Sequence, residues 1–555
     1  MVNINFINQD IVYQAVKGET ILAAARKAGI TIEAPCNGVG TCGKCKVLIE
    51  NIHGTNIVCE EGRHHLTPEE IESGYVLACQ TKVFSDITVV YDNTAKQNKT
   101  LKILSDGQSF DYAIKRKVNK FFDGSKTIVT YEGVEIGCEV GNTTKELYGL
   151  SVDIGTTTVV TALIDMNSGE EITSVSELNP QSLHAQDVLT RIKFASDVDG
   201  LTVMYNEITE SLNSMIADIT AQTNIDPSHI YEAVYSGNTT MIHLACNVNP
   251  ATLGRYPYTP QIRGGNNISA DALNISPFGK IYLPPIISSY VGPDITSGVL
   301  VSRLEKKKGT TLFIDIGTNG EMVIAKDGSL SATSTAAGPA FEGMNITFGM
   351  RAGKGALERF EITAQNDIAI RVIGDVPATG ICGSGLLDIV GELVRVGIIG
   401  VNGKFQNAQR GNYNVVLEEY LKEYEGKPAF EITEGIYLTQ KDMRQVQLAK
   451  GSVRAGVEAL LLSQNVSAEN VDLVQIAGSF GYHLKAGSLI NIGLLPREFE
   501  GKIKFVGNTS KTGGKAFLLN SDFRTYMENL VGKITGVELA NRDDFDKLFV
   551  RALNF

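Results

Sequence analysis

The sequence lacks two features that would place it in or across a membrane. It has no run of about 18 uncharged apolar residues, the length that a spanning helix needs. Its first ten residues, MVNINFINQD, have no basic segment followed by an apolar one, so no signal peptide is expected. These absences predict a cytoplasmic protein without a membrane span.

An excess of basic residues is also missing. The chain has 62 Asp and Glu against 50 Lys and Arg, a formal net charge of −12. Nucleic-acid binding needs a concentrated basic face, so nucleic acid is not expected as a partner. The one short basic run, KRKVNK at 115–120, is interpreted as a solvated edge.

Cysteines are few, eight in 555 residues, which argues against a disulfide framework. Metal binding is the better expectation for those that cluster. Cys59, outside the clustered pattern, is interpreted as a buried or idle thiol. Cys138, Cys246 and Cys382 are isolated and are expected to be small core residues.

Three cysteines do cluster, in the glycine-rich stretch APCNGVGTCGKCKV at 34–47. Cys36, Cys42 and Cys45 have the spacing C-x5-C-x2-C, and Cys79 follows after 33 intervening residues. Four thiolates can hold a zinc ion or an iron–sulfur cluster. Structural zinc usually takes two C-x2–4-C pairs, whereas three ligands in one glycine-rich loop suit a cluster whose sulfurs accept backbone N–H groups.

The surrounding residues predict a small α+β unit over 1–92. VNINFI and IVYQAV alternate like a hairpin, ETILAAARKAG has a helical pattern ending at Gly29, and KVLIEN, YVLACQT and ITVVY are expected strands. With its cysteine spacing, this unit resembles a 2Fe–2S ferredoxin of the β-grasp fold, with one extra residue between the first two ligands. The resemblance implies a 2Fe–2S cluster held by Cys36, Cys42, Cys45 and Cys79.

The rest of the chain contains an internal duplication. LSVDIGTTTVVTALIDMNSGE (150–170) and LFIDIGTNGEMVIAKDGS (312–329) each place Asp-Ile-Gly-Thr at the end of an apolar strand, before a second strand and a turn. Backbone N–H groups and hydroxyls at such a bend can contact phosphate oxygens. The aspartates at the strand ends, Asp153 and Asp315, can position Mg²⁺ or its waters.

Two later segments carry glycines at positions of interest. In VDLVQIAGSFGYHL (471–484), Gly478 and Gly481 follow an apolar strand and allow close approach to the backbone. GICGSGLLDIVGELV (380–394) begins a helix with glycines, which favours an anion or hinge site as much as simple close packing.

Together these pieces resemble the actin–hexokinase–heat-shock-chaperone ATPases, in which two similar α/β lobes face each other across a nucleotide cleft. The resemblance implies that ATP and Mg²⁺ are bound and that Asp153 and Asp315 are catalytic. The residues implied to contact phosphate are Gly155, Thr156, Thr157, Gly317, Thr318 and Asn319. Gly478 and Gly481 are implied to flank the adenosine.

The length of the chain predicts three or four units. We expect a ferredoxin domain over 1–92, a polar linker and small hairpin region over 93–147, and a duplicated ATPase domain over 148–555. The two lobes are expected at about 148–305 and 306–555.

Combined with GNTTMIHL, LPPIISSYVGPD, AAGPAFEGMNI and IAGSFGYHLKAGSLINIGLLP, this architecture resembles the reductive activators of corrinoid enzymes. The resemblance implies ATP-dependent one-electron reduction of inactive Co(II) to Co(I) in a corrinoid protein of an anaerobic methyltransferase or O-demethylase system. An external low-potential donor would reload the cluster, and the resemblance leaves room for a homodimer through the ATPase domain. The chain departs from this family pattern in one respect. The region between the linker and the ATPase domain is short, so it leaves little room for a separate middle domain.

Two other functions compete with this one. The first is ATP-dependent activation of another low-potential enzyme, such as a 2-hydroxyacyl-CoA dehydratase; those activators hold a 4Fe–4S cluster between subunits, unlike a four-cysteine N-terminal unit. The second is a sugar or carboxylate kinase with a regulatory cluster, for which no substrate-facing catalytic Asp stands out. An actin-like filament protein would have no use for a redox module.

A partner surface is predicted at STAAGPAFEGMNITFGMRAG (334–353), close after the second phosphate loop. Its glycines would keep the segment deformable, and Phe341, Met344, Phe348 and Met350 would offer an adaptable apolar surface to a corrinoid protein. The competing interpretation is that these side chains form ordinary core under the lobe.

Overall fold

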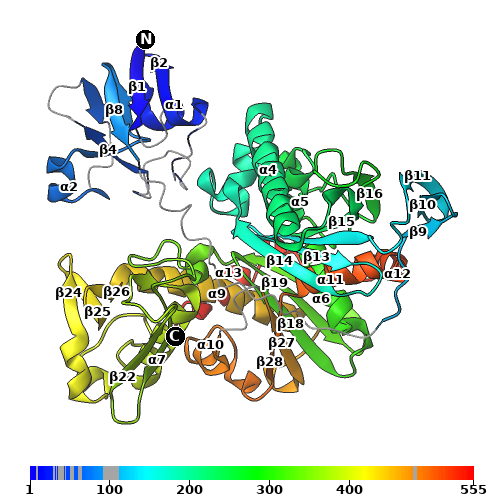
Figure 1. Cartoon of the computed structure of the whole chain (residues 1–555). Coiled ribbons are helices and arrows are strands. Elements are labelled where there is room, and N and C mark those ends of the chain that lie inside the picture. The colour runs from blue at the N-terminus through cyan, green and yellow to red at the C-terminus, as the bar shows by residue number, and fades with distance from the viewer. Residues whose placement is uncertain are drawn as a thin grey trace. The chain divides into compact units, whose positions relative to one another are not determined.

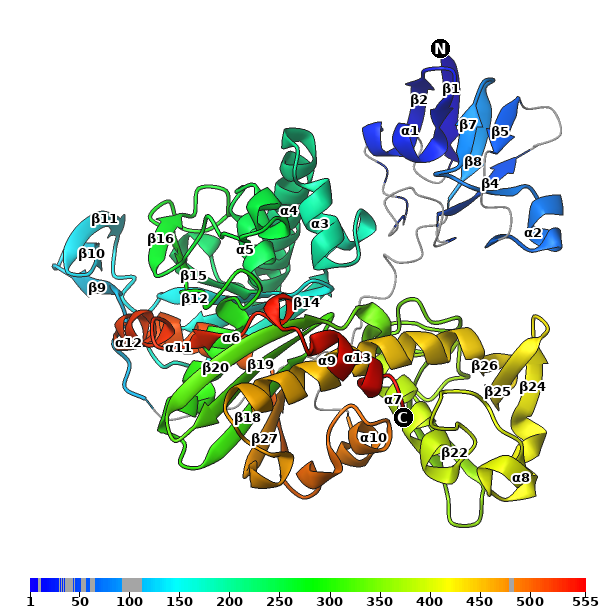
Figure 2. The same ribbon diagram turned by 180° about the vertical axis from the view of Figure 1, so that it is seen from behind.

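The computed structural model describes residues 1–7, 11–28, 30, 32, 34, 43, 45–50, 56–59, 65–91, 112–478 and 484–555. The chain forms two compact units. One contains Met1–Lys99 and Pro180–Gly200, and the other contains Thr100–Asn179 and Leu201–Phe555. Their elements are labelled in Figures 1 and 2.

The N-terminal unit is built on a five-stranded sheet in the order β2-β1-β8-β4-β6. Its strands are Val2–Phe6 (β1), Ile11–Ala15 (β2), Lys46–Glu50 (β4), Tyr75–Leu77 (β6) and Ile87–Val90 (β8). The predicted hairpin is confirmed by the antiparallel pairing of β1 with β2. A second sheet, in the order β3-β7-β5, consists of Glu19–Thr20, Thr81–Val83 and Ile57–Cys59.

One helix, α1 (Ile21–Lys27), supplies much of the core of this unit. The Thr20 hydroxyl accepts a hydrogen bond from the Ala23 N–H and caps the helix start. Ile21, Leu22 and two alanines of α1 are buried with alternate residues of the sheet. A short helix, α2 (Pro68–Glu72), follows a capping box at Thr67.

The region before the first phosphate loop forms a three-stranded sheet, more than the predicted hairpin. Its order is β11-β10-β9, with strands Val118–Phe122 (β9), Lys126–Tyr131 (β10) and Val134–Val140 (β11). Val118, Val129 and Tyr131 are buried in the same core as the first large sheet. This small sheet is therefore packed onto the second unit.

The first large sheet has the order β14-β13-β12-β15-β17-β16. Its strands are Tyr148–Ile154 (β12), Thr158–Asp165 (β13), Glu171–Leu178 (β14), Ile230–Gly237 (β15), Asn266–Ser269 (β16) and Lys280–Leu283 (β17). Helices α4 (Val198–Thr223), α5 (Thr239–Ala245) and α6 (Pro293–Ser302) belong to this half of the chain, and α3 (Val188–Phe194) lies in the segment grouped with the N-terminal unit.

The second large sheet repeats the design, in the order β28-β27-β18-β19-β20-β29. Its strands are Thr310–Ile316 (β18), Asn319–Lys326 (β19), Ser329–Ala336 (β20), Leu473–Ala477 (β27), Ile503–Gly507 (β28) and Thr535–Gly536 (β29). In each sheet an antiparallel three-stranded meander is followed by parallel neighbours, β15 in one and β27 in the other. The topology confirms the duplication expected from the two phosphate loops.

Helices and smaller sheets complete the second half. The helices are α7 (Gly383–Val396), α8 (Ala408–Gly411), α9 (Gln440–Ser463), α10 (Ala486–Asn491), α11 (Thr509–Leu519), α12 (Asp522–Val531) and α13 (Phe545–Ala552). The small sheets contain Ala356–Ile362 (β21), Ile368–Val372 (β22), Gly380–Ile381 (β23), Leu421–Tyr424 (β24), Lys427–Thr433 (β25) and Ile436–Thr439 (β26).

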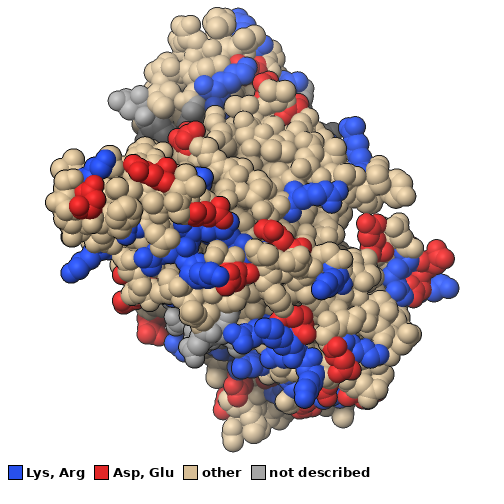
Figure 3. Space-filling model, turned by 90° about the vertical axis from the view of Figure 1, so that its right-hand side faces the viewer, with Lys and Arg blue, Asp and Glu red and all other residues tan. Residues whose placement is uncertain are grey.

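Helix α11 joins the halves of the second unit, whereas α9 packs within the second half. α11 contacts α6, β12 and β15 although it follows β28 of the other sheet in sequence. α9 packs on β19 and β20 (Figure 2). Among the described residues, no helix is long and apolar enough to cross a membrane. Figure 3 shows basic and acidic side chains interspersed over the visible face, so neither sign covers it.

Candidate functional site

The two phosphate loops meet in one cavity of about 180 Å³. The Thr157 and Thr318 hydroxyls are 3.2 Å apart, although they are 161 residues apart in sequence. The cavity is lined by nine of the predicted site residues, Asp153, Gly155, Thr156, Thr157, Asp315, Gly317, Thr318, Asn319 and Gly478. Gly481 lies outside the described residues.

Asp153, at the end of β12, is held by the start of α11. The Asn508 side-chain amide donates to its Oδ2 and the Ser510 hydroxyl to its Oδ1, both at 2.8 Å. Asn508 also caps α11, since its Oδ1 accepts from the Lys511 N–H. Desolvation raises the pKa of Asp153, and the two hydrogen bonds oppose that rise. The C-terminal part of the chain therefore orients the first predicted catalytic carboxylate.

Asp315 lies at the end of β18 among other carboxylates. Desolvation, together with the charge of Asp153, raises its pKa to about 7. Asp294, in the first turn of α6, has its pKa raised to about 8 by desolvation and by Asp315. Desolvation, with added repulsion from Asp294 and Asp315, raises the pKa of Glu321 well above its usual value. Such a group of acids favours a bound cation, because a cation stabilises all of the charged forms together.

Asp294 and Glu321 were missed by the sequence reasoning. Glu321 could have been found, because in the β18–β19 hairpin it is the direct cross-strand partner of Asp315. Its side chain is 5% exposed, and its Oε1 has no hydrogen-bond partner among the described residues. Asp294 follows Pro293 at the start of a helix, which gives no signal of a site without the fold.

Gly478 lies against the second phosphate loop. Its φ is +116°, and a Cβ there would be 2.7 Å from the Ile316 carbonyl oxygen and 3.1 Å from Asp315 Oδ1. Only glycine fits this approach. The role of Gly478 beside the adenosine stays a prediction.

The start of α7 also lines the cavity, through Cys382, Gly383 and Ser384. It is tied to the second phosphate loop by a short relay, in which the Thr318 hydroxyl donates to Glu342 Oε1 at 2.7 Å. A Cβ on Gly383 would be 1.6 Å from the carbonyl oxygen of Phe341, the residue before Glu342. The glycines of this segment thus serve close packing beside the cleft.

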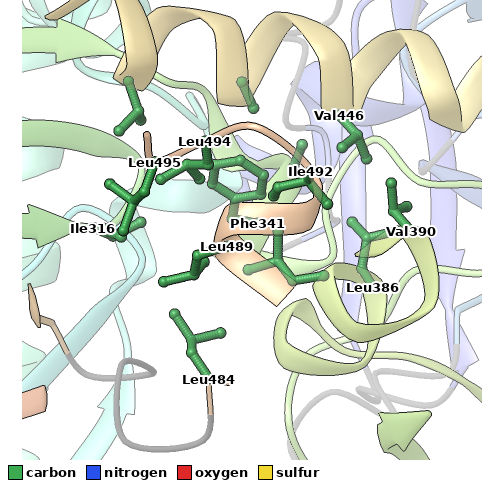
Figure 4. Packing of buried hydrophobic residues seen from close by; sticks show 14 of the residues in the cluster. Ile316, Phe341, Leu386, Val390, Val446, Leu484, Leu489, Ile492, Leu494 and Leu495 are labelled. Atoms are coloured by element: carbon green, nitrogen blue, oxygen red, sulfur yellow. The ribbon is translucent and has the colours of Figure 1, made fainter. Parts of the chain in front are cut away.

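The prediction of a partner surface at 334–353 is wrong for Phe341, near the middle of the segment. Phe341 is 0% exposed and lies in a core with Leu386, Leu489 and Ile492 (Figure 4). Phe348 is half-buried, and its ring lies 5.3 Å from that of Tyr424. The interpretation of these aromatic rings as packing is therefore the better one.

The second candidate site is in the N-terminal unit. Cys45 and Cys79 are both buried, and their Sγ atoms are 3.2 Å apart. That separation is far beyond a disulfide bond of about 2.05 Å and lets both thiols reach one metal centre. Cys36 and Cys42 lie outside the described residues.

The isolated cysteines differ from one another. Cys382 is buried and Cys246 is half-buried, with its pKa raised to about 12 by desolvation. Cys138 is exposed on β11, so its expected place in a core is wrong. The side chain of Cys59 lies outside the described residues.

Comparison with known proteins covers most of the chain. Residues 309–555 match the family described as the C-terminal domain of RACo, the ASKHA domain, and residues 148–307 match the RACo middle region. Residues 5–84 match the 2Fe-2S iron-sulfur cluster binding domain.

Individual relatives agree with these matches. Corrinoid activation enzyme RamQ of Eubacterium limosum is 34% identical over 420 residues, which cover 73% of this chain and 70% of that protein. The Co(II) methylated amine-specific corrinoid protein reductase of Methanosarcina barkeri is 27% identical over 432 residues, which cover 74% of this chain and 77% of that protein. A solved structure titled reductive activator for corrinoid, iron-sulfur protein has a TM-score of 0.73 at 29% identity, covering 100% of this chain and 98% of that chain.

Proposed function

The chain belongs to the family of reductive activators of corrinoid proteins, and we propose that it couples ATP hydrolysis to the one-electron reduction of Co(II) to Co(I) in a corrinoid protein. It is an activating reductase with an N-terminal ferredoxin domain and an ASKHA domain. The observation that carries the proposal is the presence in one chain of a buried cysteine pair and a cleft formed by two phosphate loops.

Cys36, Cys42, Cys45 and Cys79 would hold a 2Fe–2S cluster in the ferredoxin domain. The donor set fits, because the Cys45 and Cys79 thiols are 3.2 Å apart in a buried setting. When bound, the cluster supplies a one-electron carrier. The surrounding core, with buried Ala78 and Val47, keeps water away from the two described sulfurs.

Asp153 and Asp315 would position Mg²⁺ in the cleft, with Asp294 and Glu321 completing the acidic group. The fit is supported by the buried Glu321 Oε1, which has no hydrogen-bond partner among the described residues, and by carboxylates whose pKa values are raised by desolvation and by one another's charge. Oxygen ligands of this kind suit Mg²⁺.

The phosphates of ATP would be bound by the two turns that meet in the cleft. Thr157 and Thr318, with their neighbouring backbone N–H groups, would hold oxygens from opposite sides. Glu342 accepts a hydrogen bond from Thr318, so a change at the phosphates can reach the segment that precedes Gly343.

ATP is required because the reduction is unfavourable. A plant-type cluster has a potential near about −400 mV, and a one-electron step uphill loses a factor of ten for each 59 mV or so. Co(II) corrinoids hold an axial ligand, and Co(I) prefers none. An activator that binds the ligand-free form better raises the effective potential by its differential affinity, and ATP turnover would then release the complex.

Three further parts of the proposal rest on the sequence alone. These are that the corrinoid protein belongs to a methyltransferase or O-demethylase system, that an external low-potential donor supplies the electron, and that the chain forms a homodimer through its ATPase domain.

Anaerobic reconstitution tests the proposal. The reduced protein, mixed with Mg·ATP and a Co(II) corrinoid protein, should produce the absorbance of Co(I), and omission of ATP should prevent it. The proposal would be contradicted if the protein hydrolysed ATP but produced no Co(I) with any of the corrinoid proteins of methyltransferase systems.

A further inference from the structure

A second cavity, of about 770 Å³, lies away from the nucleotide cleft. It is lined by residues from the C-terminal end of α7, the end of α8, the second half of α9, the end of α10 and the loop after it, and the end of α13 with the residues that follow. Its volume is within the range of about 300–1,000 Å³ that is usual for small-molecule sites. None of the predicted site residues lines it.

The lining of this cavity is basic although the whole chain carries a net charge of −12. Four arginines line it, against two glutamates, Glu458 and Glu498. Arg454 and Arg551 both form ion pairs with Glu458. Two of the four arginines are therefore already paired with one carboxylate.

The other two arginines, Arg410 and Arg497, have no ion pair within the part of the chain that the structure describes. Arg410 belongs to α8, and Arg497 follows Pro496 after α10, so the two come from separate segments. Both residues are exposed where they line the cavity. Guanidinium groups from different elements of one cavity can bind one anion together, because each offers a planar pair of N–H donors.

A buried lysine lies behind the wall. Lys450, on α9, is 0% exposed, and its Nζ donates to the Asn554 carbonyl oxygen and lies 4.9 Å from the Phe555 ring centre. Both of these neighbours line the cavity. Desolvation and the charge of Arg454 lower the pKa of Lys450 to about 7, as expected for an amine without a nearby countercharge.

Part of the remaining wall is apolar. Val394, Ile399 and Leu495 line the cavity together with the Phe555 ring. An apolar wall beside a few convergent charged groups is typical of a site for an organic ligand with a charged end.

We propose that this cavity binds a small organic anion, whose phosphate or carboxylate group is held by Arg410 and Arg497 and whose carbon part contacts the apolar wall. This proposal goes beyond the corrinoid-reducing function and does not rest on it.

The test is calorimetric titration of the full-length protein, with the cleft filled by saturating Mg·ADP so that it does not bind the probe. Pyrophosphate serves as the phosphate probe and citrate as the carboxylate probe. Wild type should bind one of them at one site per chain, and the double variant Arg410→Gln with Arg497→Gln should weaken that binding by about tenfold or more.

A matched control removes two positive charges elsewhere on α9, by Lys441→Gln with Arg444→Gln. Both residues are exposed and neither lines the cavity. This control should bind the probe as wild type does, and both double variants should keep the wild-type rate of ATP hydrolysis, which shows that they are folded. The proposal is overturned if wild type binds neither probe, or if the two double variants lose affinity equally or not at all.

Discussion

At the scale of single residues, Glu321 gives the sharpest test of the proposed cation site. It is buried, its Oε1 lacks a hydrogen-bond partner among the described residues, and it faces Asp315 across the β18–β19 pair. Glu321→Gln removes one negative charge and keeps the shape. We expect ATP hydrolysis to fall at least about tenfold, with more Mg²⁺ needed for half-maximal rate.

Steady-state hydrolysis measured over a range of Mg²⁺ concentrations checks this expectation. Glu423→Gln is the matched control, because Glu423 is exposed on β24 and does not line the cleft. A Glu321→Gln protein with the wild-type rate and Mg²⁺ dependence would remove Glu321 from the site.

The cysteine ligands are tested in the same way. Cys79→Ser should abolish the 2Fe–2S absorbance, whereas wild type should contain two irons and two sulfides per chain, and Cys59→Ser should leave the spectrum unchanged. Zinc, or four irons per chain, would contradict the assigned cluster.

Residue types and spacing were enough to expect Cys45 beside Cys79 and both phosphate-loop aspartates in one cleft, which is where the structure has them. They did not predict Asp294, because its place in the cleft depends on where α6 packs. Phe341 was placed at a surface because the loop composition alone does not distinguish a deformable contact from a tight core.

At the scale of elements, the close crossing of α6 and α11 holds the cleft together. A Cβ on Gly513 of α11 would lie 2.4 Å from Ser297 Cβ and 2.6 Å from its Cα on α6. Gly513→Ala should therefore force the helices apart, with a loss of about 1–3 kcal/mol in the free energy of unfolding. ATP hydrolysis should also fall, because α6 carries Asp294 and the start of α11 orients Asp153.

Chemical denaturation followed by circular dichroism measures this loss. Gly487→Ala in α10 is the control, since a Cβ there meets nothing within 4 Å and alanine favours a helix by up to about 1 kcal/mol. If the two alanine variants were equally stable, α6 and α11 would be able to accommodate an extra methyl group at their crossing despite the short distances.

A buried ion pair joins α12 to β15. Arg524 donates from both terminal nitrogens to the Glu232 carboxylate at 2.8 Å, and both side chains are at most 2% exposed. Arg524→Met leaves Glu232 buried and unpaired, so we expect a destabilisation of about 3–5 kcal/mol.

The double variant with Glu232→Leu should recover most of that loss, because no buried charge then remains. The same denaturation measurement checks both proteins. If the single variant were as stable as the double, water would have to reach Glu232.

The meanders of both large sheets were predictable, because their apolar runs and turn residues are local signals. The return of α11 and α12 to the first sheet was not, since such contacts join residues 360 and 292 apart in sequence. The third strand beside the predicted 127–141 hairpin was missed because VNKFF at 118–122 is short and follows a basic run.

At the scale of the whole molecule, the redox and ATPase functions lie on separate hydrophobic cores. Every buried member of the ferredoxin core comes from Val2–Val89, and the two large cores of the other unit contain only residues from Val118 onward. The order of these units and their family were predictable from motifs. Damage at one site should therefore stay local, while the overall reaction needs both.

Two variants test this separation. Asp315→Asn should lower ATP hydrolysis by at least about 100-fold and keep the 2Fe–2S absorbance, because Asp315 belongs to the second unit and the ferredoxin domain has a core of its own. Cys79→Ser should lose the absorbance and keep the wild-type rate of hydrolysis. Neither should produce Co(I) from a Co(II) corrinoid protein, since one lacks the energy source and the other the electron carrier. Formation of Co(I) by the Asp315→Asn protein would mean that the electron transfer runs without ATP, and loss of hydrolysis in Cys79→Ser would mean that the cluster is needed to fold or switch the ATPase.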